Sequence, residues 1–155
     1  MTIEIKAKEI KLVDINKIHP WVKNVNKHPD DQIENFIKII EYQGFTTPIE
    51  VENETMDIVV GHGRYLAAKK LKMTHVPVIF RDYKDYDQKW LRMVSDNAIA
   101  NRAEIELKFV NEGLEEVGPF DIELLGLKDF KIEPAELPEK KERKQTQCPN
   151  CGEKF

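Results

Sequence analysis

Cysteine is scarce in this chain: of 155 residues only Cys148 and Cys151 are cysteines, and both lie close to the C-terminus. This excludes a secreted fold held together by several disulfides. Apolar runs of about 18 residues, the length that crosses a bilayer, are also missing. The first residues, MTIEIKAKEIKLVDI, alternate charged and apolar side chains and lack the apolar segment of a signal peptide. We therefore expect a soluble cytoplasmic protein without a membrane partner.

An excess of basic residues is missing as well. The chain has 24 Lys and Arg against 28 Asp and Glu, which gives a net charge of −4. A protein that binds DNA by itself usually has a basic face, because contacts with phosphates supply most of its affinity. Two local basic clusters remain, one of Lys69, Lys70 and Lys72 and one within 140–144. A solvated helix face and a charged linker explain them at least as well as a DNA-binding patch.

The hydrophobic pattern predicts an α+β fold. We expect a small mixed sheet with helices packed against one side, then a helical extension and a flexible tail. Alternating or continuous apolar runs predict strands over 10–13, 48–53, 57–60 and 76–80. Apolar spacing at helical period and N-terminal capping residues predict helices over 29–42, 64–71, 85–98, 107–117 and 121–127. The helix over 29–42 has one apolar stripe, and it should pack on the sheet.

The turn Gly61-His62-Gly63-Arg64 joins a predicted strand directly to a predicted helix. Its glycines allow a positive φ and let a ligand approach the backbone closely. The following helix presents unpaired N–H groups and the positive end of its dipole at this place. Arg64 adds a planar cation suited to phosphate oxygens. The turn therefore favours an anion, although a plain tight turn with Arg64 paired to a carboxylate would use the same residues.

Five segments together resemble the ParB N-terminal domain of the ParB/sulfiredoxin superfamily, most closely the ParB-like "nuclease" domains of phages. The resemblance covers about two-thirds of the chain. It rests on the segments NVNKHP (24–29), QGFTTPIEV (43–51), DIVVGHGRYLAAKKL (57–71), VPVIF (76–80) and SDNAIAN (95–101). If the chain is phage-encoded, its cytoplasm is that of a bacterial host cell.

The resemblance implies a pocket for a nucleoside triphosphate, CTP or ATP, with Mg²⁺. The residues that match the family motifs are the phosphate loop Gly61, His62, Gly63 and Arg64, the flanking strand residues Pro48 and Ile49, and the later pair Asp96 and Asn97. Asp96 is the candidate magnesium ligand. Asn24 and His28 match a segment that lies close to the pocket in relatives. His62 can contact phosphate or act as a general acid or base near neutral pH, or it can simply face solvent.

Several departures from the family pattern limit what is carried over. His62 replaces the glutamate of the ParB loop, and the cysteine of sulfiredoxins is absent, so peroxiredoxin repair is not expected. The segment from Asn24 to His28 lacks the arginine that phage-type relatives have there. No helix-turn-helix module follows, and this argues against a role in chromosome or plasmid partition.

The C-terminal sequence Cys148-Pro-Asn-Cys151-Gly has the form of a zinc-ribbon knuckle. Tetrahedral Zn²⁺ needs four ligands, and no further Cys or His lies within the preceding fifty residues. Either two chains of a homodimer share one Zn²⁺, or a distant histidine completes the site, or no zinc is held. We therefore divide the chain into a ParB-like domain (1–102), a helical extension (103–130), a linker (131–147) and a half zinc-ribbon knuckle (148–155).

The leading hypothesis is a ParB-like nucleotide-binding protein of phage or mobile-element DNA metabolism, with nucleoside triphosphatase or nuclease activity as its candidate chemistry. Three alternatives stay open. The first is a small-molecule kinase that acts on a serine-type hydroxyl, which would need a carboxylate base near the pocket. The second is a non-catalytic adaptor of a DNA methyltransferase or terminase, which would reach DNA through its partner. The third is a DNA-binding module that uses the lysine clusters and the knuckle.

Overall fold

A computed structural model of the chain describes residues 9–100 together with 102, 105, 110 and 113. The chain divides into two compact units: the first is Met1–Ala103 with Glu123–Gly126, and the second is Glu104–Ile122 with Leu127–Phe155. Within the predicted helix over 107–117 the described residues Val110 and Gly113 are both helical. The predicted helix over 121–127, the linker and the pair Cys148 and Cys151 lie outside the described residues.

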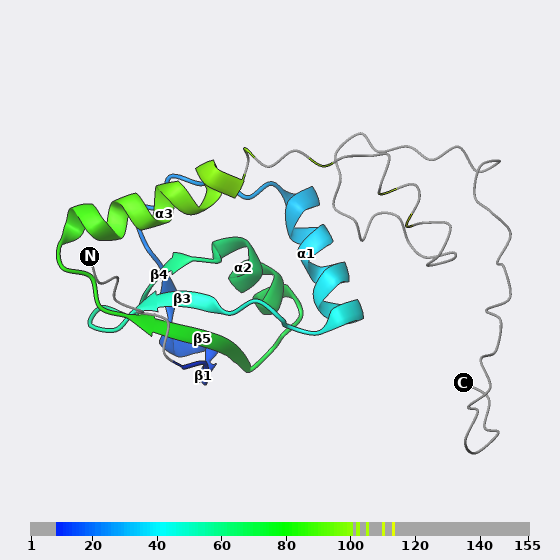
Figure 1. The fold of residues 1–155 in the computed structure, drawn as a ribbon. Coiled ribbons are helices and arrows are strands. Elements are labelled where there is room, and N and C mark those ends of the chain that lie inside the picture. Colours follow the sequence, from blue (N-terminus) through cyan, green and yellow to red (C-terminus); the bar gives the residue numbers. More distant parts are fainter. Residues whose placement is uncertain (1–8, 101, 103–104, 106–109, 111–112, 114–155) are drawn as a thin grey trace, which may run out of the picture. The chain divides into compact units, whose positions relative to one another are not determined.

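A five-stranded mixed sheet forms the centre of the first unit, with strand order β1-β5-β3-β4-β2 (Figure 1). The pairs β1–β5 and β3–β4 are antiparallel, and the pairs β3–β5 and β2–β4 are parallel. The strands are β1 (Lys11–Asp14), β2 (His19–Pro20), β3 (Ile49–Glu52), β4 (Asp57–Val60) and β5 (His75–Arg81). Four of them confirm the predicted strands to within one residue at every end.

The strand β2 and the short 3-10 helix η1 (Ile15–Lys17) were not predicted. The sequence predicts only a proline-terminated loop in this stretch. Pro20 nevertheless pairs with Ile58 at the outer edge of the sheet. An edge strand tolerates proline because its missing N–H can face away from the neighbouring strand.

Three helices complete the described part of the first unit: α1 (Asp30–Gln43), α2 (His62–Lys70) and α3 (Tyr86–Ala100). The predicted ends of α1 are confirmed, since Pro29 is its N-cap and Gly44 its C-cap with φ +81°. The predicted cap of α3 is also confirmed, because the Gln88 N–H donates to Asp85 Oδ1 at 2.9 Å. The start of α2 is two residues earlier than predicted, because Gly61 itself takes the left-handed N-cap conformation, with φ +97°.

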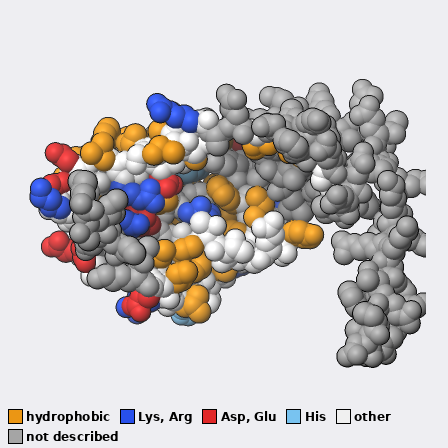
Figure 2. Space-filling view, in the orientation of Figure 1, with side chains coloured by type: hydrophobic (Ala, Val, Ile, Leu, Met, Phe, Trp, Pro, Cys, Tyr) orange, Lys and Arg blue, Asp and Glu red, His pale blue; other side chains and the backbone are white. Residues whose placement is uncertain are grey.

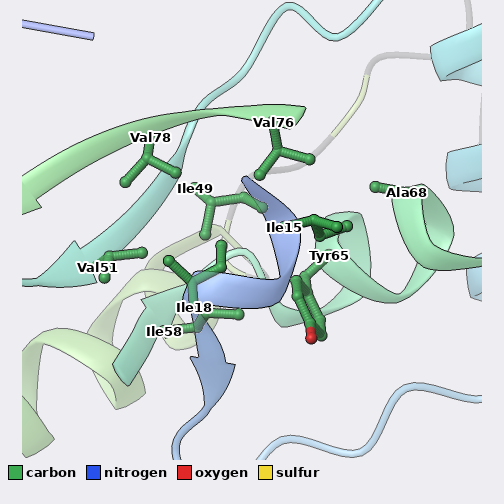
Figure 3. Close-up of a cluster of buried hydrophobic side chains, with 9 residues drawn as sticks. All are labelled: Ile15, Ile18, Ile49, Val51, Ile58, Tyr65, Ala68, Val76 and Val78. Carbon is green, nitrogen blue, oxygen red and sulfur yellow. The ribbon is translucent and has the colours of Figure 1, made fainter. Parts of the chain in front are cut away.

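The main hydrophobic core lies between the sheet, η1 and α2 (Figure 3). It contains Ile15, Ile18, Ile49, Val51, Ile58, Tyr65, Ala68, Val76 and Val78. A second cluster joins Trp21, Val59 and Val60 to Met93 of α3. Ile58 and Val59 are neighbours in β4 but belong to different clusters, because successive side chains of a strand point to opposite faces. Helix α2 therefore covers one face of β4 and α3 the other, so the α+β class is confirmed but the prediction that the helices pack against one side of the sheet is wrong.

Helix α1 packs mainly on α2, and the prediction that its apolar stripe would lie on the sheet is wrong. The contact depends on Gly63, where an added Cβ would lie 2.7 Å from Cε2 of Phe36. The missing side chain lets the Phe36 ring reach the backbone of α2. An apolar stripe shows that a helix is covered but does not show what covers it. Among the described residues, no helix is long and apolar enough to span a bilayer.

Candidate phosphate-binding pocket

A cleft opens where β4 ends and α2 begins. Its walls come from four parts of the chain: the segment before α1, α1 itself, the β4–α2 junction and α3. We call it the β4–α2 pocket. It is lined by Asn26, His28, Gln32, Phe36, Val59, Val60, Gly61, His62, Gly63, Arg64, Met93, Asp96 and Asn97. The structure thus brings together residues that lie up to 71 positions apart and that include most of the predicted site.

The floor of the pocket is the N-terminus of α2. Gly61 caps this helix without a side-chain hydrogen bond, and the first turn contains no acidic residue. The first intrahelical bond runs from the Tyr65 N–H to the Gly61 carbonyl at 3.0 Å. The N–H groups of His62, Gly63 and Arg64 therefore have no partner within the helix. Free amides and the positive end of the helix dipole make this floor attractive to an anion.

Two stacked histidines form one side of the pocket. The rings of His28 and His62 lie 6.2 Å apart between centroids, with an interplanar angle of 18°. Nδ1 of His28 lies 2.9 Å from Oε1 of Gln32. The Nε2 atoms of both histidines are buried and have no hydrogen-bond partner among the described residues. Buried polar atoms are nearly always paired in native proteins, so these two nitrogens are available to a molecule that enters the cleft.

His62 is nearly fully buried, with 5% of its surface exposed. Burial, and then the neighbouring His28, lower the pKa of His62 to about 4 against a weaker opposing effect of Asp57. At neutral pH the ring is therefore uncharged when no ligand is bound. A general acid near neutral pH, one of the roles predicted for His62, would require a bound anion that raises this pKa again.

The lowered pKa of His62 predicts a loss of stability in mild acid. The unfolded chain has the ordinary value of 6.5 and the folded chain a value of about 4, so between them the unfolded state binds the extra proton. The contribution of the uncharged His62 ring to the free energy of unfolding is fully present above pH 6.5 and is lost as the pH falls toward 4. At pH 5 the free energy of unfolding should be about 2 kcal/mol lower than at pH 8 from this group. Urea unfolding at both values should show the difference in the wild type.

The matched variants for this measurement are His62→Gln and His75→Gln. Glutamine cannot take up a proton, so His62→Gln should lose this part of the pH dependence. His75 is exposed on β5, and His75→Gln should keep it. An unchanged pH dependence in His62→Gln would contradict the burial of this ring.

Arg64 lies beside the histidines with its guanidinium close to Gly61. Its Nη2 donates to the Pro48 carbonyl at 3.3 Å, while its Nε is buried and has no hydrogen-bond partner among the described residues. An added Cβ on Gly61 would lie 3.0 Å from Nη2, and the φ of +97° strains any other residue at this position. Burial lowers the pKa of Arg64 and Asp96 raises it, but a guanidinium stays charged in proteins. Arg64 therefore brings a fixed, incompletely paired cation to the anion site.

Asp96 and Asn97 line the pocket from α3, as the sequence predicts. Oδ1 of Asp96 accepts from Nη1 of Arg92 at 2.8 Å. The described residues contain no group of three or more His, Cys, Asp or Glu side chains that could hold a metal ion. One carboxylate and one amide oxygen still fit Mg²⁺, which takes few protein ligands when phosphates and water supply the others.

The remaining predicted site residues do not line the pocket. Ile49 is fully buried in the main core, and Pro48 contributes its carbonyl to Arg64. Asn24 forms a turn in which its Oδ1 accepts from the Asn26 N–H at 3.0 Å, and it is Asn26 that lines the pocket. Of these three residues, Pro48 and Asn24 hydrogen-bond to residues that line the pocket, and Ile49 belongs to the core.

Sequence reasoning missed Gln32 and Arg92. Arg92 lies four residues before Asp96 in the predicted helix, and this spacing places the two side chains side by side, so the candidate Asp96 pointed to it. Gln32 had no such signal, because His28 lies before the start of α1 at Asp30.

Comparisons with known proteins show the family of the chain. Residues 1–97 match the family model of the ParB N-terminal domain. The chain is 33% identical over 75 residues to the ParB-like nuclease domain-containing protein YnaK of Escherichia coli (strain K12). The aligned region covers 47% of this chain and 85% of YnaK.

Two solved structures share the fold. The C-terminally truncated chromosome-partitioning protein ParB from Caulobacter crescentus, complexed with CTP-gamma-S, gives a TM-score of 0.59 at 19% identity over 71% of this chain. The pNOB8-like ParB N-domain gives 0.50 at 12% identity over 76% of this chain. The chain spans 64% and 46% of these two structures, respectively. With the family model matching residues 1–97, the chain belongs to the ParB N-terminal domain family.

Proposed function

We propose that the β4–α2 pocket binds the phosphates of a nucleoside triphosphate, CTP or ATP, together with Mg²⁺. Four buried side-chain nitrogens have no hydrogen-bond partner among the described residues. The proposal is carried by three of them, His28 Nε2, His62 Nε2 and Arg64 Nε, while the fourth, Arg81 Nε, lies 3.2 Å from Glu50 Oε1. All three belong to residues that line one cleft at the start of a helix. Each unpaired buried donor or acceptor costs on the order of 1–3 kcal/mol, and a bound ligand that pairs with them removes that cost.

A nucleotide fits this pocket better than a small inorganic anion does. The amides of α2 and Arg64 account for the phosphates, and Asp96 with Asn97 accounts for the cation that accompanies a triphosphate. The C. crescentus ParB that shares this fold was solved with CTP-gamma-S. The role in phage or mobile-element DNA metabolism, and any homodimer with a shared Zn²⁺, are proposals that rest on the family resemblance and on residues outside the described part.

The test is a binding titration of the full chain with the four common nucleoside triphosphates, with and without Mg²⁺. We expect saturable binding of CTP or ATP at micromolar concentration, weaker binding of the corresponding monophosphate, and tighter binding when Mg²⁺ is present. Calorimetry measures all of these affinities on one protein sample. Absence of binding for all four triphosphates would contradict the proposal.

Phosphotransfer to a small hydroxyl compound is the second candidate function. The observation that favours it is Asp96, because a carboxylate in the pocket wall is what a kinase of this kind needs as its base. A kinase would form nucleoside diphosphate and phosphoserine only when free serine is present, whereas triphosphate hydrolysis would release inorganic phosphate without serine, so measurement of these products distinguishes the two functions.

Nuclease activity and direct DNA binding have less support in the geometry. The relative YnaK carries the nuclease name, but the described residues of this chain contain no cluster of three metal ligands for phosphodiester hydrolysis. On the face shown in Figure 2, basic, acidic and hydrophobic side chains of the described residues are interspersed, without a broad basic surface. Lys69 and Lys70 already interact with Asn16 and Asp30. A salt-dependent shift in DNA mobility would favour the DNA-binding alternative.

A further inference from the structure

The β4–α2 pocket contains a negative charge that works against its own preference for anions. Asp96 lines the same cleft as Arg64 and the N-terminus of α2, and its side chain is 37% exposed. A free carboxylate near the phosphates of a triphosphate would repel them, and the repulsion is strong where water is partly excluded. Something must compensate this charge if the pocket is to bind a nucleotide.

Arg92 lies in the position to compensate it. Its guanidinium bridges two carboxylates: Nη1 donates to Asp96 Oδ1 at 2.8 Å, and Nη2 donates to Glu50 Oε2 at 3.0 Å. Nε of Arg92 completes a two-pronged contact with Glu50, 3.2 Å from Oε1. Arg92 itself does not line the pocket. One planar cation thus connects a residue in the pocket wall to a residue in the interior.

Glu50 holds this arginine in place from β3. It is buried, with 6% of its surface exposed. Besides Arg92, it accepts a short hydrogen bond from the Tyr83 hydroxyl and pairs with Arg81 Nε at 3.2 Å. Burial and the hydrogen bond to Glu50 raise the pKa of Tyr83, so this hydroxyl stays a donor. With these partners around Glu50, the Arg92 guanidinium has a fixed anchor and a fixed direction.

We infer that Arg92 is a positioning residue of the nucleotide pocket, which neutralises the Asp96 carboxylate and turns it toward the cation of a magnesium–triphosphate complex. The inference rests on the proposed function. Arg92 occupies Oδ1 of Asp96 and leaves Oδ2 for the cation. Burial lowers the pKa of Arg92, but the hydrogen bonds to Glu50 and Asp96 outweigh this effect and raise the pKa overall. This agrees with a permanent positive charge at this point.

The test compares Arg92→Gln with Arg81→Gln, because both arginines pair with Glu50 but only Arg92 also holds Asp96. Nucleotide affinity is measured by calorimetry in EDTA and in Mg²⁺, and thermal unfolding is recorded for each protein. We expect Arg92→Gln to weaken nucleotide binding about tenfold in EDTA. The affinity of this variant should also depend more strongly on Mg²⁺ than that of the wild type does. Arg81→Gln should lower the melting temperature in a similar way but keep both affinities within about twofold of the wild type.

A third protein makes the test specific for the charge of Asp96. In Arg92→Gln/Asp96→Asn the uncompensated carboxylate is gone, so affinity in EDTA should return to within about threefold of the wild type, while the Mg²⁺ effect is lost. The inference would be overturned if Arg92→Gln and Arg81→Gln lost affinity equally, or if the double variant did not recover. Neither result would contradict the proposed nucleotide binding. A wild-type protein that binds no triphosphate would overturn the proposed function and this inference with it.

Discussion

Arg64→Ala is expected to weaken nucleotide binding about a hundredfold, which corresponds to about 2.7 kcal/mol. The expectation follows from the position of the guanidinium beside the start of α2, with Nε unpaired and only Nη2 bonded, to the Pro48 carbonyl. Charge-assisted hydrogen bonds to phosphate contribute about 1.5–3 kcal/mol. Arg64→Lys keeps the charge but loses the planar fork, so its loss should be closer to tenfold. Calorimetric titration with the preferred triphosphate measures both.

Lys70→Ala is the matched control for this measurement. Lys70 is a cation of the same helix, but it is exposed, pairs with Asp30 at 3.3 Å and does not line the pocket. Its removal should change the affinity less than twofold, since exposed ion pairs contribute little. If Arg64→Ala and Lys70→Ala lost affinity equally, a diffuse charge effect would explain the data and the placement of phosphate at Arg64 would be wrong.

Ile49→Ala is expected to lower the free energy of unfolding by about 2–5 kcal/mol. Ile49 is 0% exposed and lies in the middle of the main core, between β5 and β4 in the sheet. Truncation removes buried methyl groups and leaves a cavity that close-packed neighbours refill only in part. Urea unfolding measures the loss. In conditions where the variant is fully folded, its nucleotide affinity should stay within about threefold of the wild type.

Leu12→Ala is the control for the core assignment, because Leu12 is also an apolar strand residue but is 76% exposed. Its substitution should cost less than about 0.5 kcal/mol. The family resemblance places Ile49 beside the nucleotide, whereas the structure places its side chain in the core. If Ile49→Ala lost nucleotide affinity without losing stability, Ile49 would lie beside the nucleotide and its assignment to the core would be wrong.

Local sequence signals were sufficient for most of the elements and for the phosphate loop. Pro29, Gly44 and Asp85 mark helix ends because each has a backbone or capping preference that acts within a few residues. The Gly61 to Arg64 turn was identified for the same reason, since its glycines and its cation are adjacent in the chain.

Contacts between distant segments could not be predicted in this way. The packing of α1 on α2 depends on Gly63 meeting Phe36, and nothing near either residue indicates the other. The same is true of Arg92 and Glu50, which are 42 residues apart and meet only in the folded chain, where α3 packs on β4, the neighbour of β3 in the sheet. Ile49 was assigned to the nucleotide through its motif position, although its alternation within β3 decides that it points into the core. The missed features are thus the ones that depend on tertiary structure.

A nitrogen-detected NMR titration of the histidine side chains tests the central claim most directly. The chain has four histidines, of which His28 and His62 line the pocket while His19 and His75 are exposed elsewhere on the sheet. With the preferred triphosphate and Mg²⁺, the Nε2 signals of His28 and His62 should shift in a saturable way and those of His19 and His75 should stay in place. Binding that leaves the His28 and His62 signals unmoved would contradict the account.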